Sequence, residues 1–156
     1  CSDIQIHPQF STMKNLLLFA FLLLTSWLAA QNNELSGKWV GVLTQQEGGF
    51  RQKYYCELVI QQKGNKITGT TYVSVEKVHA EMAFTGEVNG SVITFKENRI
   101  IQYSKLDDMA WCLKWGNLSL RKKGTTWFLE GMWDGQSIYG PCIPGKVFLQ
   151  KEVPRA

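Results

Sequence analysis

The sequence predicts an all-β domain, an antiparallel up-and-down barrel of about eight strands. After residue 30 the apolar residues show no sustained i, i+3, i+4 spacing, which an amphipathic helix would require. They alternate instead with polar residues, in short runs that are rich in β-branched and aromatic side chains. About eight such runs, joined mostly by short turns, are typical of an up-and-down barrel.

The first half of the domain is expected to contain four strands, each with its apolar side chains on one face. Their approximate ranges are residues 37–45, 50–62, 66–75 and 80–88. The dipeptide Asn89-Gly90 is a strong hairpin signal. Residues 76–79 are expected to be a connector, which makes His79 an exposed loop residue.

The second half is expected to contain the remaining strands and the longest loops. A strand through Ile93 and Phe95 is followed by a break over residues 99–110, predicted to be a flexible loop at an open rim. The later strands are expected at residues 111–121, 125–133 and 146–151. Residues 134–144 are predicted to be a loop.

Three strands carry a glycine two positions after an apolar residue, in Ile67-Thr68-Gly69, Phe84-Thr85-Gly86 and Leu129-Glu130-Gly131. A strand glycine permits the sharp coiling that a small closed barrel requires. The same missing side chain would also leave room for a ligand against the backbone. We favour the structural interpretation and keep the second open.

The sequence predicts three parts of the chain, two of which lie before residue 31. Residues 13–30 have the pattern of a secretory signal peptide, with Lys14, an apolar run and a small-residue exit. A transmembrane helix is the less favoured alternative, since polar residues interrupt the run before about 20 apolar positions. Residues 1–12 are interpreted as an upstream extension, and residues 31–156 as the folded domain, secreted or periplasmic and not inserted in a membrane after cleavage.

Three cysteines follow the predicted signal: Cys56, Cys112 and Cys142. In an oxidising compartment two of them are expected to pair. We favour Cys112 with Cys142, because Cys142 lies in a proline- and glycine-rich loop whereas Cys56 lies within a strand. The cysteines lack the close-pair spacing of a zinc site, so no metal is expected.

Composition argues against a nucleic-acid partner. The chain has 17 basic and 13 acidic residues, a formal net charge of +4, and the basic residues are scattered rather than striped. A solvated surface is the simpler interpretation.

The opening Gly37-Lys38-Trp39, together with Ile67-Thr68-Gly69-Thr70 and Gly131-Met132-Trp133, resembles the calycin superfamily of lipocalins, avidins and fatty-acid-binding proteins. The resemblance covers most of residues 31–156 and implies a lipocalin-like barrel that binds a ligand. In lipocalins an arginine packs over the first tryptophan; here Lys151 or Arg155 would have to replace it. The opening also resembles that of bacterial secreted metalloprotease inhibitors, which would make residues 31–35 the reactive segment.

Candidate site residues follow from these patterns. Gly37 and Trp39 are expected at the closed base of the barrel. Three further tryptophans near strand ends, Trp111, Trp115 and Trp133, are candidates for a ligand pocket or for the core. Glu97 and Lys114 share the parity of inward residues, so a buried ion pair is the hypothesis and a solvated rim position for Glu97 the alternative.

The leading functional prediction is a binding protein that holds a small apolar or amphipathic molecule in the barrel. The alternatives are a protease inhibitor or other protein-binding barrel, and a structural envelope module with a filled barrel and no ligand. No catalytic motif and no cofactor motif is recognisable, so the chain is not expected to be an enzyme.

Overall fold

The computed structural model describes residues 34–153. The predicted extension and signal peptide, residues 1–30, and the candidate Arg155 lie outside the described residues. Within the described part the chain is all β, with these strands: β1 Gly37–Thr44, β2 Lys53–Lys63, β3 Lys66–Val75, β4 Val78–Asn89, β5 Val92–Ser104, β6 Leu113–Lys123, β7 Thr126–Ser137, β8 Gly140–Pro141 and β9 Gly145–Lys151. No helix long and apolar enough to cross a membrane occurs between residues 34 and 153.

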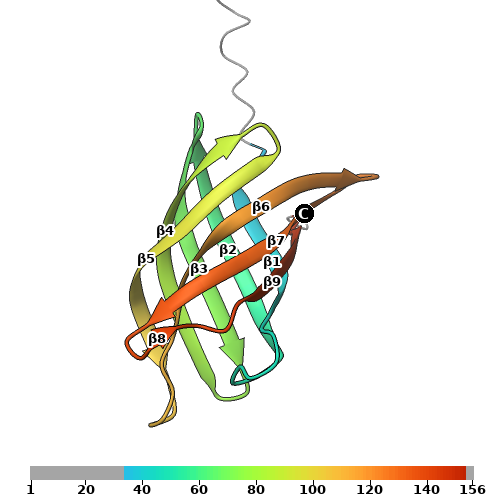
Figure 1. Ribbon diagram of the computed structural model, residues 1–156. Coiled ribbons are helices and arrows are strands. Elements are labelled where there is room, and N and C mark those ends of the chain that lie inside the picture. Colours follow the sequence, from blue (N-terminus) through green and yellow to red (C-terminus); the bar gives the residue numbers. More distant parts are fainter. Residues whose placement is uncertain (1–33, 154–156) are drawn as a thin grey trace, which may run out of the picture. The chain divides into compact units, whose positions relative to one another are not determined.

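The strands form a closed antiparallel barrel (Figure 1). Each strand from β1 to β7 pairs with the next one, and β9 pairs with both β7 and β1, which closes the ring. Eight strands therefore make the wall, and the two-residue β8 is an addition beside the end of β7. This confirms the predicted fold class.

One end of the barrel is closed by Trp39. Its side chain is fully buried, and its indole N–H donates to the carbonyl of Leu35 at 2.8 Å. The ammonium of Lys151 lies 5.6 Å from the centre of the Trp39 ring, a cation–π contact. Gly37 begins β1 with a φ of 122°, a conformation that favours glycine. Trp39 is thus packed and hydrogen-bonded at the end of the barrel where β1 begins.

The interior beyond this plug is filled by alternate side chains from every wall strand. The largest fully buried ones include Phe84, Ile60, Met82, Leu118 and Leu129. The strand glycines belong to this packing: a Cβ at Gly69 would lie 1.9 Å from the carbonyl oxygen of Val59, and one at Gly131 would lie 2.0 Å from that of Asn117. Neighbouring backbone occupies the space, which confirms the structural interpretation of these glycines.

Several boundary predictions are wrong. Residues 50–52 and 111–112 were expected to begin strands but lie in loops, because β2 begins at Lys53 and β6 at Leu113. Residues 99–104 continue β5, so the loop at the rim is confined to residues 105–112. His79 lies within β4 instead of a connector, with Nδ1 3.1 Å from the Ser104 hydroxyl and its ring stacked on Tyr72. Strand β7 extends to Ser137, beyond the expected end at Trp133.

Candidate functional site: a cavity at the mouth of the barrel

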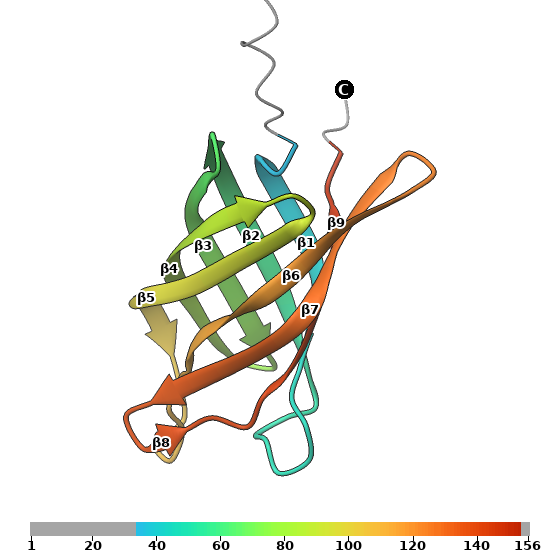
Figure 2. The ribbon, with the colours of Figure 1, turned by 45° about the horizontal axis from the view of Figure 1, so that its top comes forward.

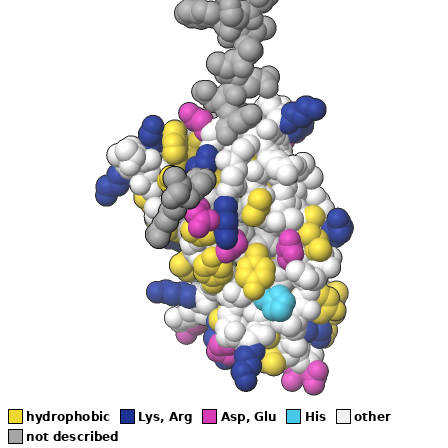
Figure 3. Space-filling model, turned by 180° about the vertical axis from the view of Figure 1, so that it is seen from behind, with side chains coloured by type: hydrophobic (Ala, Val, Ile, Leu, Met, Phe, Trp, Pro, Cys, Tyr) yellow, Lys and Arg dark blue, Asp and Glu magenta, His cyan; other side chains and the backbone are white. Residues whose placement is uncertain are grey.

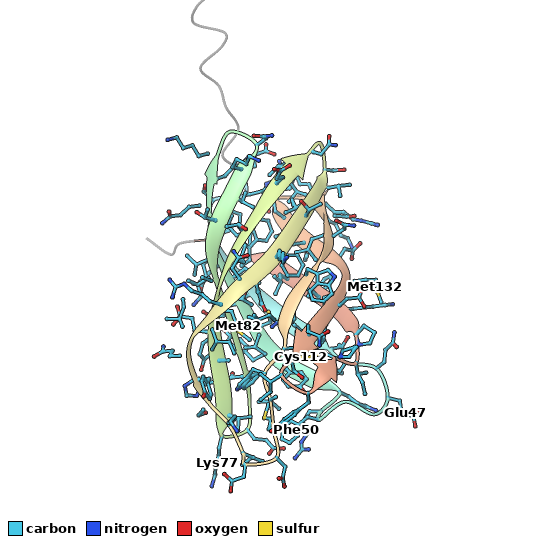
Figure 4. The ribbon with its side chains drawn as sticks, turned by 60° about the vertical axis from the view of Figure 1, so that its left-hand side comes forward. Glu47, Phe50, Lys77, Met82, Cys112 and Met132 are labelled. Atoms are coloured by element: carbon cyan, nitrogen blue, oxygen red, sulfur yellow. A yellow bond between two sulfur atoms is a disulfide. The ribbon has the colours of Figure 1, made fainter. Side chains whose placement is uncertain are left out.

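The end of the barrel opposite Trp39 contains a cavity of about 240 Å³. Three segments surround it: residues 45–52 after β1, residues 105–112 after β5, and residues 138–144 between β7 and β9 (Figure 2). Its principal lining side chains are Phe50, Tyr54, Met109, Trp111, Lys114 and Trp133. Figure 4 shows Phe50 and Cys112 together at this end, below Met82 in the barrel.

Two tryptophans form apolar walls because their polar atoms are already used. The indole N–H of Trp133 donates to the carbonyl of Thr44, and that of Trp111 to the carbonyl of Ser104, both at 2.9 Å. Both side chains are largely buried. The rings therefore offer the cavity their carbon surfaces and no free donor.

Tyr54 is also satisfied within the protein. Its hydroxyl donates to Oε1 of Gln45 and accepts the backbone N–H of Arg51 at 3.0 Å. Burial raises the pKa of Tyr54, although the bond from Arg51 opposes this shift. Gln45 in turn donates to the carbonyl of Ile143, so this chain of bonds fixes the loops on one side of the cavity.

Lys114 is a buried charged residue in the lining of the cavity. Its ammonium lies 2.9 Å from Oε2 of Glu97, and both side chains are almost completely buried. It also donates to the carbonyl of Cys112 at 3.3 Å. An ammonium has three N–H donors, and the third meets no acceptor among residues 34–153.

Glu97 stands at the point where the β5–β6 ladder ends. The two strands pair only from Val92 to Lys96 on β5. Beyond that point the backbone N–H of Lys114 donates to Oε2 of Glu97 at 2.8 Å, so the carboxylate replaces a strand carbonyl. The predicted ion pair is confirmed, and the alternative of a solvated rim position is wrong.

The disulfide Cys112–Cys142 joins two of the segments at the mouth. Its formation confirms the predicted pairing, with Cα atoms 6.3 Å apart. Both cysteines line the cavity, and the bond ties residues 105–112 to residues 138–144. Cys56 is free and buried, as expected for an inward residue of β2.

Trp115 does not line the cavity. Since Lys114 points inward, strand alternation sends Trp115 to the outer surface, where it lies beside Ile138 in a shallow groove between β5 and the end of β7. The predicted set is thus divided: Trp111, Trp133 and Lys114 meet at the mouth, Glu97 lies behind Lys114, and Trp115 lies outside.

Sequence reasoning missed several lining residues, notably Phe50, Tyr54 and Met109. Two of them could have been found from the sequence, because each is a large apolar residue in a mostly polar segment. These are Phe50, in residues 45–52, and Met109, in residues 105–112. Such residues commonly pack against a site or a core opening. No group of three or more His, Cys, Asp or Glu side chains between residues 34 and 153 could hold a metal ion.

Comparison with known protein families, with curated proteins and with solved structures finds no match for this chain. The function is therefore inferred from the barrel and its cavity. The inhibitor alternative concerns residues 31–35, of which residues 31–33 lie outside the described residues. Leu35 is buried, its carbonyl accepts the indole N–H of Trp39, and its backbone N–H donates to Oε1 of Gln62.

Proposed function

We propose that the protein binds one small, flat, amphipathic molecule in the mouth cavity, as a secreted barrel of lipocalin-like type. The observation that carries the proposal is the unpaired N–H of the Lys114 ammonium, which lines the cavity beside two tryptophans whose indole N–H groups are already bonded. Pockets for small molecules typically combine apolar walls with a few placed polar groups.

The cavity sets the size of the ligand. Its volume of about 240 Å³ is below the roughly 300 to 1,000 Å³ of pockets for drug-sized molecules. It equals the liquid volume of about eight water molecules at about 30 Å³ each. A molecule built on one aromatic ring fits this volume, whereas a long fatty acid would have to displace the packed interior around Phe84 and Leu118.

The charges favour a neutral ligand with a hydrogen-bond acceptor. Lys114 is already compensated by Glu97, so a ligand carboxylate would enter as an extra charge. Asp108 at the rim of the cavity adds repulsion for an anion. A carbonyl or hydroxyl oxygen can accept the remaining Lys114 proton without that cost.

Secretion into an oxidising compartment, to the exterior or a periplasm, is part of the proposal. The Cys112–Cys142 disulfide supports it, since such bonds persist mainly in oxidising surroundings. The signal pattern of residues 13–30 supports it independently.

Isothermal titration calorimetry with three compounds of similar size tests the function. Acetophenone carries a neutral carbonyl, benzoate a carboxylate, and ethylbenzene has no acceptor. We expect acetophenone to bind at least about tenfold more tightly than ethylbenzene, the effect of one hydrogen bond from a charged donor, and benzoate to bind most weakly. Absence of saturable binding, or equal affinity for acetophenone and ethylbenzene, would contradict the proposal.

A double variant isolates the polar contact. Glu97→Gln with Lys114→Met removes the donor without leaving an unpaired buried charge. This variant should bind acetophenone and ethylbenzene equally well. Trp115→Ala, on the outer surface, is the matched control and should leave all three affinities unchanged.

A further inference from the structure

The barrel wall is interrupted between β5 and β6. The two strands pair only from Val92 to Lys96 on β5, although β5 continues to Ser104. We call residues 98–103 the open edge. They have no strand partner on the β6 side, and within the described part of the chain no backbone hydrogen bond joins them to the loop that follows β5. The wall is continuous at the back of the barrel, seen in Figure 3, where β2 and β3 pair from Tyr55 onward.

Irregularities in β5 explain the interruption. Its pairing with β4 shifts register at two places, which leaves Asn98 and Ile101 of β5 as extra residues. A bulge of this kind bends its strand and often ends the pairing on one side. The bend in the second half of β5 is visible in Figure 2. Bulges are specified features of a fold that often lie beside binding sites, so the open edge is a candidate site.

A groove of about 510 Å³ borders the open edge. Asn98 and Ile100 of β5 line it, and its apolar lining also includes Trp115 of β6 and Ile138 after β7. Both of these large apolar residues reach solvent, Trp115 with 39% of its surface and Ile138 with 84%. Exposed apolar side chains beside unpaired strand backbone are typical of an interaction site.

A buried acceptor without a donor lies at one end of the open edge. Glu97 lines the groove, and its Oε1 is buried with no hydrogen-bond partner among residues 34–153. The other oxygen, Oε2, is bonded to Lys114, which lines the mouth cavity and not the groove. Leaving a buried acceptor unbonded costs free energy. An N–H donor that enters the groove would remove this cost.

From these observations we propose that the open edge binds an extended peptide segment of another protein, which adds a strand to β5 within the groove. Backbone N–H and C=O groups alternate along an unpaired strand, and the backbone of a second strand matches both. A peptide N–H beside Glu97 donates to Oε1. Apolar side chains of the peptide cover Trp115 and Ile138, which no described residue covers.

The open edge also sets the length of the peptide. About six residues at about 3.3 Å each give roughly 20 Å. At the far end the indole N–H of Trp111 already donates to the carbonyl of Ser104 at 2.9 Å, so the free backbone ends there. The segment that fits is therefore short, about the length of a hexapeptide.

Charge does not select the peptide, because both signs occur around the groove. Lys96 and Arg99 lie on β5, and Asp134 lies opposite Trp115 in the strand register. We therefore expect an uncharged peptide of alternating apolar and polar residues. The inference does not rest on the proposed ligand of the mouth cavity, since each site has its own polar group, Glu97 in the groove and Lys114 in the cavity.

Calorimetry with capped hexapeptides tests the proposal. The probes alternate threonine with valine, leucine or phenylalanine. At least one should bind saturably, with a dissociation constant of about 1 mM or below. The same peptide with every backbone nitrogen methylated keeps its side chains but has no N–H donor, and it should bind at least about tenfold more weakly. Failure of all three probes to bind at about 1 mM, or equal binding of the methylated peptide, would overturn the proposal.

Two variants locate the site. Trp115→Ala should weaken the peptide about fivefold or more and leave the affinity for acetophenone unchanged, so the groove and the cavity are tested separately. Tyr55→Ala is the matched control, because Tyr55 is an exposed aromatic residue on a strand that is paired on both sides. It should bind the peptide like wild type. Equal peptide affinity of wild type and Trp115→Ala would overturn the placement in the groove.

A second copy of the chain is the rival occupant of the open edge. Sedimentation equilibrium of wild type and Trp115→Ala separates the two cases. The proposal predicts a wild-type protein that is monomeric at about 0.1 mM and binds the peptide. A wild-type dimer that Trp115→Ala dissociates and that the peptide does not displace would overturn it.

Discussion

At the scale of single residues, Glu97 combines two roles in one carboxylate oxygen. Oε2 accepts both the ammonium and the backbone N–H of Lys114, so it neutralises a buried charge and also completes the ladder where β5 leaves β6. Its other oxygen, Oε1, meets no donor among residues 34–153. The ion pair therefore fixes the position of the Lys114 side chain at the cavity. It has a desolvation free-energy cost that a pair of apolar residues would not have.

Glu97→Gln should destabilise the protein by about 3 kcal/mol, because the amide retains the hydrogen bond to the backbone but leaves Lys114 as an unpaired buried cation. Chemical denaturation measures this change. The double variant Glu97→Gln with Lys114→Met should recover most of the lost stability. A single variant as stable as wild type would mean that the pair adds nothing.

The raised pKa of Cys56 predicts that the free energy of unfolding depends on pH in the alkaline range. Burial raises the pKa of this thiol from its ordinary value of 9.0 to about 12, and the nearby Glu97 adds to the shift while Lys114 opposes it. Between those two values the unfolded chain releases the proton and the folded chain retains it. The stability associated with Cys56 is therefore fully present below about pH 9 and is lost as the pH rises toward 12, by at most about 1.4 kcal/mol per pH unit.

Denaturation of wild type and Cys56→Ala from pH 8 to 11 measures this effect. Other titrating groups affect both proteins equally, so the difference in slope belongs to Cys56. The wild type should lose stability more steeply above pH 9. Parallel curves for the two proteins would refute a buried, protonated thiol.

At the scale of elements, alternation in the sequence was sufficient to predict the inward faces and the ion pair, and it failed where β5 becomes irregular. Register shifts near Glu81 and Ala83 leave Asn98 and Ile101 of β5 without partners on β4. The period of two is broken there, and the sequence from Arg99 onward was therefore interpreted as a loop. Strand continuation to Ser104 depends on pairing with β4, which a local pattern does not contain.

The cavity was less predictable than the fold for a related reason. Parity correctly places Lys114 and Trp133 inside, but three loops decide which residues meet at the mouth, and loop conformations follow from long-range bonds such as Gln45 to Ile143. The parity rule also excludes Trp115, which the sequence interpretation had grouped with the other tryptophans on the basis of residue type.

The disulfide should control both the stability of the mouth and its affinity for ligand. Replacing Cys112 and Cys142 by Ala removes a link across 30 residues, and chain-entropy arguments give a loss of about 3 to 4 kcal/mol. Because the bond holds two walls of the cavity together, acetophenone affinity should also fall. Denaturation and calorimetry measure the two effects, with Cys56→Ala as the cysteine control; unchanged affinity would show that the walls hold their positions without the bond.

At the scale of the whole molecule, the barrel has a packed body and two different ends. Trp39, Leu35 and Lys151 close the base, while aromatic walls and a positioned lysine leave a small cavity at the mouth. This division means that the barrel is neither a hollow container for a long lipid nor a completely filled module.

The central claim, a ligand at the mouth and none at the base, is tested most directly by nuclear magnetic resonance. Acetophenone is titrated into isotope-labelled protein while the indole N–H signals of the tryptophans are followed. The account predicts saturable shifts of Trp111 and Trp133, whose rings line the cavity, and none for Trp39. Shifts of Trp39, or no shift of Trp111 and Trp133 at saturating ligand, would contradict it.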